Sequence, residues 1–458
     1  MEKDNRQYQK MTETPIPKLI TSLAVPTMLT MLVTSVYNVI DTYFVSKLGT
    51  RASAAVGIVF SLMALIQALG FTAGMGAGSV ISRLLGKKDE TKAQKIASCA
   101  FVSSAALGIL LGAAGILFLE KLMRFLGAAE NVLPYAAEYA RYILYAAPVM
   151  MVSFVLNNLL RAEGKTKLSL IGIGCGSLLN IALDPLFIFA FDWGIRGAAI
   201  ATAVSQCAGC AILFLFFLRK NTIIRISIKN FSLDFSLYKE FIGNGMPSMF
   251  RQGLSAAASI TLNHTAAYYG DAAVAAMSIV GKIFLMVYCV LIGFGQGYQP
   301  VVGYNYGAGN YDRIRKSYRF FMIAGTVGMT LAGAALFFFS DDLIRQFVPN
   351  DKKVTETGVQ ALLMQCAAMP LLPIGIACNM TFQAVGKSVK AALLASCRQG
   401  IFFLPLIFSL PHLFGVSGLQ SAQPAADALT FLVCVPVMHK FMASLKRRNK
   451  TDKSASTP

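Results

Sequence analysis

Long apolar stretches with few charges constrain this chain more than any other feature of its sequence. Leu107–Leu119 is almost entirely aliphatic, Ala or Gly, and so is Ala208–Leu218. Each lies in a charge-poor stretch of about 20 residues, enough for a helix to cross the hydrocarbon core of a bilayer at about 1.5 Å per residue. These runs lack the alternation of barrel strands, and only helices and closed barrels satisfy their backbone in lipid. The sequence therefore predicts a helical integral membrane protein.

The charge content of the chain argues against a large soluble fold. Charged residues make up 14% of its 458 residues, whereas soluble proteins carry about 25%. The net charge of +19 comes from Lys and Arg in short loops and tails, with no basic patch interleaved with aromatic residues. We therefore expect no nucleic-acid partner, and we expect membrane lipid to surround much of the chain.

The apolar stretches predict an all-α integral membrane protein with about 12 transmembrane helices in two pseudo-symmetric six-helix lobes. The N-lobe is predicted at residues 1–218 and the C-lobe at 241–442, with a cytoplasmic connector at 219–240 and a polar cytoplasmic tail at 443–458. The predicted spans are 19–45, 54–81, 96–119, 136–158, 169–191, 197–218, 241–266, 274–303, 320–340, 357–381, 391–413 and 425–442.

The two lobes are related by an internal repeat. Shifting the chain by 221 residues places Pro26 on Pro247 and Gly49 on Gly270. Each repeat holds six spans, an even number, so both copies start on the same side of the membrane and form parallel repeats of the kind found in transporters. Since each half would complete the other's cavity, we expect a monomer. Other glycine pairs at this offset are Gly74 with Gly295, Gly76 with Gly297, Gly86 with Gly307, Gly194 with Gly415, and Gly197 with Gly418.

The distribution of Lys and Arg predicts the orientation of the chain. Of its 41 Lys and Arg residues, 29 lie on the side shared by both termini, 9 on the opposite side and 3 within predicted spans. The positive-inside rule therefore places both termini in the cytoplasm. The chain is polar up to Lys18, so no cleavable signal peptide is expected. We predict a multi-pass protein of a bacterial cell (plasma) membrane.

Two carboxylates inside predicted spans are candidates for function, because inserting an ionisable group costs about 2.5–3.5 kcal/mol on translocon scales. Asp41 lies in the first span and Asp184 in the fifth. Asn180 precedes Asp184 by four residues and therefore shares its helix face. Pro185 is expected to bend that helix and free nearby carbonyl groups. Thr202, early in the sixth span, adds a hydroxyl oxygen.

These oxygens suit a hard cation such as Na⁺, at a possible metal site of Asp41, Asn180, Asp184 and Thr202, or a proton shared by the two carboxylates. The alternative is two unrelated Asp residues at helix ends, which the spacing does not exclude. The sequence contains no P-loop, so direct use of ATP is not expected. We predict no cofactor, with H⁺ or Na⁺ as the coupling ion.

Two cationic residues lie in the predicted seventh and eighth spans. Arg251 and Lys282 either pair with carboxylates or face a cavity, and the alternative is that their charged ends snorkel to the membrane surface. A third, Arg398, lies in the eleventh span. The sequence leaves these choices open.

Short motifs follow one another in order along both halves of the chain. In order and spacing they resemble the MATE (multidrug and toxic compound extrusion) family, nearest to its MepA-like branch, over essentially the whole chain. The motifs of the first half are Pro26, Asn38-Val-Ile-Asp41-Thr42, Gly76-Ala-Gly78, Ser82-Arg83-x-x-Gly86, Arg161-Ala-Glu-Gly164-Lys165 and Asn180-Ile-Ala-Leu-Asp184-Pro185. Those of the second half are Gln299-Pro300-x-x-Gly303-Tyr-Asn305-Tyr-Gly307-Ala308 and Gln383-Ala-Val-Gly386-Lys387.

The resemblance implies a secondary active multidrug efflux antiporter. Such a protein exports amphiphilic, often cationic drugs and dyes in exchange for H⁺ or Na⁺ by alternating access, and so contributes to antibiotic resistance. The resemblance also implies a cation site in the N-lobe with its carboxylates at Asp41 and Asp184, and with Asn180 and Thr202 as helpers. Bending of the first helix near Pro26 would open and close the path.

The C-lobe departs from the pattern of some family members, which carry acidic residues in spans seven and ten. Here span seven reads Arg251-Gln-Gly-Leu-Ser255, and Ala361–Met380 in span ten contains no Asp or Glu. Coupling is therefore expected to depend on the N-lobe, with Pro185 as a second gating candidate. Arg251, Lys282 and the adaptable Met286 are candidates for the cavity lining.

Other functions were weighed against export. A lipid-linked oligosaccharide or lipid flippase of the same superfamily is the main alternative, but such proteins often have extra spans and a more cationic cavity. A membrane-embedded enzyme needs clustered acidic or His residues, whereas Asp341-Asp342 lacks a second acidic pair and the three His residues are far apart in sequence. A passive channel is disfavoured by the lobe-scale repeat. We therefore predict a transporter and not an enzyme.

Overall fold

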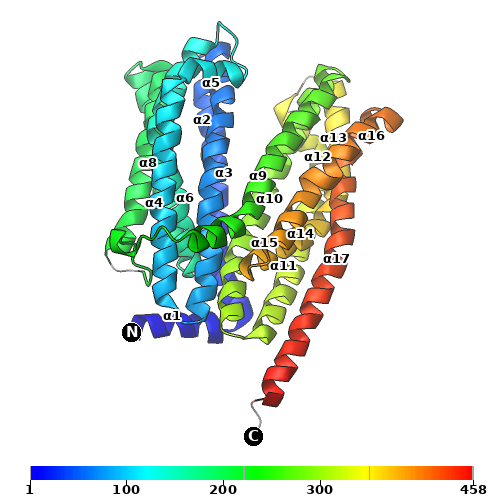
Figure 1. Cartoon of the computed structure of the whole chain (residues 1–458). Helices are drawn as coiled ribbons and strands as arrows, with labels where there is room; N and C mark the ends of the chain where they lie inside the picture. The colour runs from blue at the N-terminus through cyan, green and yellow to red at the C-terminus, as the bar shows by residue number, and fades with distance from the viewer. Residues whose placement is uncertain (1, 220–221, 350, 456–458) are drawn as a thin grey trace. The chain divides into compact units, whose positions relative to one another are not determined.

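All regular elements in the described part of the chain are helices (Figure 1). The structure is a computed structural model that describes residues 2–219, 222–349 and 351–455. Within these residues, 11 helices are long and apolar enough to cross a membrane. The remaining predicted span corresponds to α9 (Phe235–Ala267), whose 33 residues reach about 50 Å but include more polar side chains. The prediction of an all-α protein with many spans is confirmed.

The helices follow the predicted spans closely, and each is longer at one or both ends. The first half contains α1 (Glu2–Glu13), α2 (Ile16–Ser46), α3 (Thr50–Gly86), α4 (Glu90–Leu117), α5 (Leu119–Phe125), α6 (Leu133–Ala162), α7 (Thr166–Pro185), the π-helix η1 (Leu186–Ala190) and α8 (Gly194–Leu218). A short 3₁₀-helix η2 (Ile228–Asn230) precedes α9. The second half continues with α10 (Asp271–Gly307), α11 (Tyr311–Phe338), α12 (Ser340–Phe347), α13 (Lys352–Ala368), η3 (Met369–Leu371), α14 (Leu372–Ala384), α15 (Ser388–Ser396), the π-helix η4 (Cys397–Phe402), α16 (Phe403–Phe414) and α17 (Val416–Ala455).

Some elements fall outside the predicted pattern. Helix α9 begins at Phe235, six residues before the predicted span at 241, so the segment between α8 and α9 is shorter than the predicted connector. Helix α17 continues through most of the predicted tail. Connector residues 220–221 and tail residues 456–458 lie outside the described residues. The short helices α5 and α12 were not predicted, yet they begin 221 residues apart, as the repeat requires.

The chain divides into two compact units. The N-terminal unit contains Val25–Gly245 with the first part of α1, and the C-terminal unit contains Met11–Ala24 with the chain from Met246 onward. Two of the three boundaries between the units fall next to a repeated proline inside a helix, Pro26 in α2 and Pro247 in α9. The first long helix of each half therefore contributes its N-terminal part to one unit and the rest to the other.

Close backbone contacts hold these shared helices. Within the C-terminal unit, a Cβ atom added at Gly297 of α10 would collide with the backbone of Ala24 in α2. Within the N-terminal unit, a Cβ atom at Gly76 of α3 would collide with the backbone of Phe241 in α9. Gly76 and Gly297 are partners in the repeat, and close approach of two helix backbones explains why both positions are glycine.

A second pair of repeated positions is glycine for a different physical reason. Gly49 before α3 and Gly270 before α10 have φ angles of 101° and 93°. In this region of the Ramachandran plot an L-residue places its Cβ too close to the backbone, whereas glycine has no such penalty. The repeat therefore preserves the turn that begins each second span.

The fifth span of each half contains a π-helix. In the N-terminal unit, η1 follows Pro185 directly. In the C-terminal unit, η4 follows α15 and carries Arg398 at its second position. π-helical segments within α-helices are rare and frequently mark functional sites. Asp184 and Arg398 therefore lie next to or within an irregular turn.

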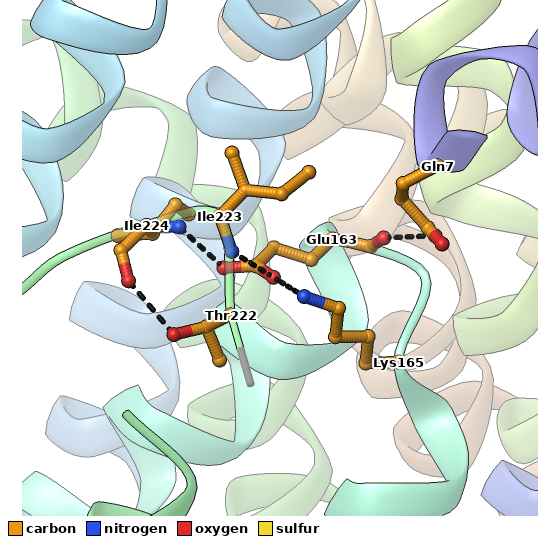
Figure 2. Close-up of polar contacts among 6 residues, drawn as sticks. All are labelled: Gln7, Glu163, Lys165, Thr222, Ile223 and Ile224. Atoms are coloured by element: carbon orange, nitrogen blue, oxygen red, sulfur yellow. Dashed lines mark hydrogen bonds and ion pairs between the residues drawn. The ribbon is translucent and has the colours of Figure 1, made fainter. Parts of the chain in front are cut away.

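A buried glutamate fixes the segment that follows α8 (Figure 2). The Glu163 carboxylate accepts hydrogen bonds from the backbone N–H groups of Ile223 at 3.0 Å and Ile224 at 2.9 Å, and it pairs with Lys165 Nζ at 2.7 Å. The Glu163 carbonyl accepts a hydrogen bond from Gln7 Nε2 at 2.6 Å. Burial raises the pKa of the Glu163 carboxyl above its ordinary value, while Lys165 and the two N–H groups oppose this shift. One residue thus ties α1, the turn after α6 and the connector together.

Candidate functional site

Two carboxylates of the N-terminal unit form the centre of the candidate site. Asp184, near the end of α7, is 0% exposed, and Asp41 of α2 is partly buried. Asn180 lies one turn before Asp184 and donates a hydrogen bond from Nδ2 to Asp184 Oδ1 at 3.2 Å. This contact follows from the four-residue spacing, which places both side chains on one face of α7.

The fold brings the two carboxylates together from distant parts of the sequence. Asp41 and Asp184 interact directly through their side chains. Tyr37 of α2 and Tyr139 of α6 lie beside the pair, close enough to interact with both carboxylates. Neither tyrosine was predicted as a site residue from the sequence. Tyr37 precedes Asp41 by four residues and could have been found on the same helix face, whereas nothing in the local sequence marks Tyr139.

Several acceptor oxygens at this site receive no hydrogen bond. They are Asp41 Oδ1, Asp184 Oδ2 and Asn180 Oδ1, and all three atoms are buried. Leaving a buried acceptor without a donor is costly, so such atoms in a native structure need an explanation. Two carboxylates and an amide oxygen provide hard ligands for a small cation, or a place for a proton between the carboxylates. The described residues contain no cluster of three His, Cys, Asp or Glu side chains that could hold a metal.

Thr202 lies at the edge of this site rather than at its centre. It is 4% exposed, and its hydroxyl interacts with the Tyr139 side chain. Tyr139 therefore lies between Thr202 and the carboxylates in the series of side-chain interactions. The role of Thr202 as a direct oxygen ligand stays a prediction.

One face of α2 carries a continuous series of side-chain bonds between Pro26 and the candidate site. Thr30 Oγ1 donates to the Pro26 carbonyl at 2.8 Å, and Thr34 Oγ1 donates to the Thr30 carbonyl at 2.8 Å. Asn38 Nδ2 donates to the Thr34 carbonyl at 2.9 Å, and Thr42 Oγ1 donates to the Asn38 carbonyl at 2.8 Å. Hydrogen bonds of this kind compete with the helix ladder and often bend helices. These bonds are expected to make the stretch of α2 between Pro26 and Asp41 easier to bend.

The C-terminal unit contains a cavity of about 470 Å³. Arg251 of α9 and Lys282 of α10 both line it, whereas Met286 is 44% exposed and is not one of its lining residues. The structure therefore places two of the three predicted C-lobe cavity residues around one space.

Asp427 of α17 is a buried carboxylate of this unit that the sequence analysis overlooked. It is 2% exposed and pairs with Arg398 Nε at 2.7 Å. Gln365 Nε2 and Gln423 Nε2 also donate to it, at 3.0 and 2.9 Å. The same argument that selected Asp41 could have found Asp427, because it lies inside the predicted span at 425–442. Its partner Arg398 had been noted only as a charge within a span.

Comparisons with known proteins agree with this arrangement. A model of the MatE family matches residues 26–186 and 247–408. The two matched ranges begin at Pro26 and Pro247, the prolines beside the unit boundaries. The family model therefore matches each half separately, which is the relation that the internal repeat predicts.

Individual relatives resemble the chain over almost its whole length. Multidrug export protein MepA of Staphylococcus aureus (strain NCTC 8325 / PS 47) is 26% identical over 438 residues, which cover 95% of this chain and 96% of the relative. An outward-facing multidrug resistance MATE transporter of the MOP superfamily has a TM-score of 0.90 at 25% identity, covering 95% of this chain and 99% of that one. A MOP superfamily transporter from Pyrococcus furiosus, described as having a binding pocket of reverse polarity that suggests a different function, has a TM-score of 0.90 at 26% identity, covering 96% and 98%.

Proposed function

Because the chain belongs to the MatE family, we propose that it is a secondary active multidrug exporter that moves amphiphilic drugs and dyes outward in exchange for H⁺ or Na⁺. Its relatives are named as an export protein and as transporters, not as enzymes. One observation carries the coupling proposal: Asp41 and Asp184 lie together in the N-terminal unit with buried acceptor oxygens that receive no hydrogen bond.

The coupling ion acts through a difference in affinity between two conformations. An ion can shift an equilibrium only as far as it binds one state more tightly than the other. When Asp41 and Asp184 approach each other, their charges repel, and a shared proton or Na⁺ removes that repulsion. Binding of the ion would therefore favour the state in which the carboxylates are close.

Movement of α2 would connect ion binding to the substrate path. Thr30, Thr34 and Asn38 bond to carbonyl groups one turn earlier, which weakens the resistance of α2 to bending. Pro26 lacks a backbone N–H and lies at the boundary of the two units. Pro26 is thus the proposed hinge in α2, and Pro185 with the following π-helix is the proposed second point of flexibility, in α7.

The membrane potential supplies enough energy for this exchange when the drug is uncharged. In a one-for-one exchange with a cationic drug such as ethidium the two charge movements cancel, and the concentration gradient of the ion drives export instead. One elementary charge moving down 100 mV releases about 2.3 kcal/mol. This corresponds to a drug gradient of roughly 50-fold for each cation. We further propose that the protein works as a monomer in a bacterial plasma membrane with both termini in the cytoplasm, since the excess of Lys and Arg lies on their side.

Ethidium efflux from energised cells that lack their own pumps tests the proposal. Wild type is expected to extrude ethidium, and Asp41→Asn at equal membrane expression is expected to lose active extrusion. Asp271→Asn is the matched control, because Asp271 is an exposed carboxylate in the first turn of α10. Equal pumping by wild type and Asp41→Asn would reject the coupling site, and no pumping by wild type would reject ethidium as cargo.

Imposed gradients in proteoliposomes identify the ion. Uptake driven by a pH gradient alone would assign H⁺, and uptake that requires a Na⁺ gradient at constant pH would assign Na⁺. In either case the response should disappear in Asp41→Asn and persist in Asp271→Asn.

A specific observation also supports a flippase as second candidate. The C-terminal cavity has three cationic side chains, Arg251, Lys282 and Arg398, but a single carboxylate, Asp427. A cationic cavity is what a transporter of phosphate-bearing lipids requires. Translocation of a head-group-labelled polyprenyl phosphate in proteoliposomes, measured by quencher access, separates the two functions. Lipid translocation without drug export would favour the flippase.

A further inference from the structure

The charge of the C-terminal cavity is opposite to that of the carboxylate site in the N-terminal unit. Of the side chains that line the cavity, Arg251, Lys282 and Arg398 are cationic, and Asp427 is the one acidic residue. In a space of low dielectric, charges interact more strongly than in water. A cationic ligand would therefore meet an excess of positive charge there, whereas an anionic group would be attracted.

The carboxylate of Asp427 is already fully engaged. Arg398 Nε and Gln423 Nε2 donate to Oδ1 at 2.7 and 2.9 Å, and Gln365 Nε2 donates to Oδ2 at 3.0 Å. A carboxylate with this many donors has little remaining capacity to attract a cation. The single negative charge of the cavity is thus already paired with side chains of the protein.

Arg398 is held in a fixed position by more than its ion pair. Its guanidinium lies over the ring of Tyr288, 4.4 Å from the centroid, and is 5.3 Å from the centroid of Phe284. Arg398 also lies at the second position of the π-helix η4. Stacking and ion pairing together restrict the guanidinium, so little conformational entropy would be lost when a ligand binds beside it.

The walls of the cavity combine apolar surface with unused acceptors. Phe284, Phe403 and Leu372 are among the aromatic and aliphatic side chains that line it. Asn379 Oδ1 and Gln399 Oε1 are buried atoms of lining residues that receive no hydrogen bond. A ligand that suits the apolar walls and the cationic side chains has an apolar body and an anionic group.

From this arrangement we propose that the C-terminal cavity binds the anionic end of an amphiphile, and that it prefers a carboxylate-bearing substrate to the same molecule with that carboxylate esterified. The proposal rests on the proposed export function only for the route by which the substrate reaches the cavity. Binding to the purified protein does not require export, so failure of one can be distinguished from failure of the other.

Rhodamine 6G and its free acid form a matched pair of probes. They share one aromatic body with N–H donors, but the first is an ethyl ester and the second carries a carboxylate. Binding to the full-length protein in an uncharged detergent can be followed by fluorescence anisotropy. We expect the free acid to bind about 10-fold more tightly, as one additional charge-assisted hydrogen bond would produce. The measurement is repeated with Asp41→Asn, so that binding of the cationic ester to the N-terminal carboxylates does not contribute.

Variants of the cavity test the role of charge. Arg251→Gln and Lys282→Gln should each weaken binding of the free acid by about 5- to 10-fold and leave the ester unchanged or bound more tightly. Lys316→Gln is the matched control, because Lys316 pairs with Asp312 on α11 and is not a lining residue of the cavity. Asp427→Asn should act in the opposite direction, improving binding of the acid and weakening binding of the ester. If Asp427→Asn does not fold, Arg251→Gln and Lys282→Gln still test the proposal.

The same chemistry occurs in anionic lipid head groups. Displacement of the free acid by short-chain phosphatidylglycerol but not by phosphatidylcholine would support an anion site that lipid also uses. Retention of the acid in the presence of both lipids would support a site for soluble substrates. Equal affinity for acid and ester, or affinities that Arg251→Gln and Lys282→Gln leave unchanged, would overturn the proposal.

Discussion

The two units treat a buried carboxylate in opposite ways. Asp184 in the N-terminal unit and Asp427 in the C-terminal unit are 0% and 2% exposed. Asp184 accepts one hydrogen bond from a neutral amide and faces a second carboxylate, whereas Asp427 pairs with Arg398 and accepts hydrogen bonds from two glutamines. Burial alone therefore does not determine whether a carboxylate in a membrane protein can bind a mobile ion. The donors around it decide whether its charge is available to a mobile ion.

The repeat is clear in the backbone but absent from the charged residues of the two candidate sites. Turns and close helix contacts recur at an offset of 221 residues because both units need the same fold. Asp41 corresponds to Leu262 and Asp184 to Pro405 at that offset. One copy of the scaffold thus holds negative groups and the other holds an excess of positive groups, which allows one molecule to offer sites of opposite charge.

The largest expected effect separates the two carboxylates by their role in coupling. Asp184→Asn should abolish the dependence of efflux on an imposed ion gradient, because it removes a carboxylate that receives too few donors. Asp427→Asn should keep that dependence, since Arg398 and the glutamines already neutralise Asp427. The measurement is the initial rate of ethidium efflux with the gradient divided by the rate without it. Of these two variants, only Asp184→Asn is expected to lower this ratio to 1, the value at which the gradient has no effect. The opposite pattern would reverse our assignment of the two sites.

Substitutions of Asp427 and of Asp41 should change the thermal stability of the protein in different directions. Asp427→Ala leaves the Arg398 charge buried without its partner, which typically costs about 3–5 kcal/mol. Asp41→Asn removes repulsion between two carboxylates and should be neutral or stabilising by about 1 kcal/mol. Six of the nine cysteines are buried, so a thiol-reactive dye reports unfolding of the purified protein in detergent.

The double variant Arg398→Met with Asp427→Leu is the control for this stability test. It removes both charges together and should recover much of the stability lost in Asp427→Ala, because a buried ion pair can often be replaced by apolar residues. A double variant as unstable as Asp427→Ala would show that the loss comes from packing and not from an unpaired charge.

The sequence was sufficient to predict the elements, because long apolar stretches and repeated glycines are local signals. Asp41 and Asp184 could be selected from the cost of burial, and Asn180 from its helical spacing. Their interaction with Tyr139 could not be predicted, since it depends on how α6 packs against α2 and α7. The pairing of Asp427 with Arg398 could not be predicted either, since it depends on how α17 packs against η4.

Glu163 offers a smaller test, of a buried carboxylate that is satisfied by backbone groups. In Glu163→Gln the amide can accept only one of the N–H bonds from Ile223 and Ile224, and Lys165 loses its charged partner. The connector should open more often, so trypsin cleavage at the exposed Arg225 should accelerate by about 5- to 30-fold, as a local loss of 1–2 kcal/mol would produce. Glu130→Gln, which breaks the exposed pair with Arg124, should leave cleavage unchanged.

The contribution of Glu163 to the free energy of unfolding should depend on pH in a defined direction. Because burial raises the pKa of Glu163, the folded state binds this proton more tightly than the unfolded chain does. Between the ordinary value for Glu of about 4.3 and the raised pKa, the free energy of unfolding should therefore fall as pH rises. This contribution should be missing in Glu163→Gln, as measured by unfolding midpoints across that range. An identical pH profile in both proteins would contradict the assignment.

The smallest expected effect is on stability, at a pair of glycines where the two units should behave alike. Gly49→Ala and Gly270→Ala should each lower stability by about 1 kcal/mol, because both positions have positive φ and no neighbouring atom would contact the added methyl group. Gly57→Ala and Gly281→Ala are matched controls within helices, where the methyl group again meets no neighbour and should raise stability slightly. Equal losses at Gly49 and Gly270, measured with the same dye, would show that the backbone repeat has the same energetic role in both units. A loss confined to one of them would extend the difference between the units from their charges to their scaffold.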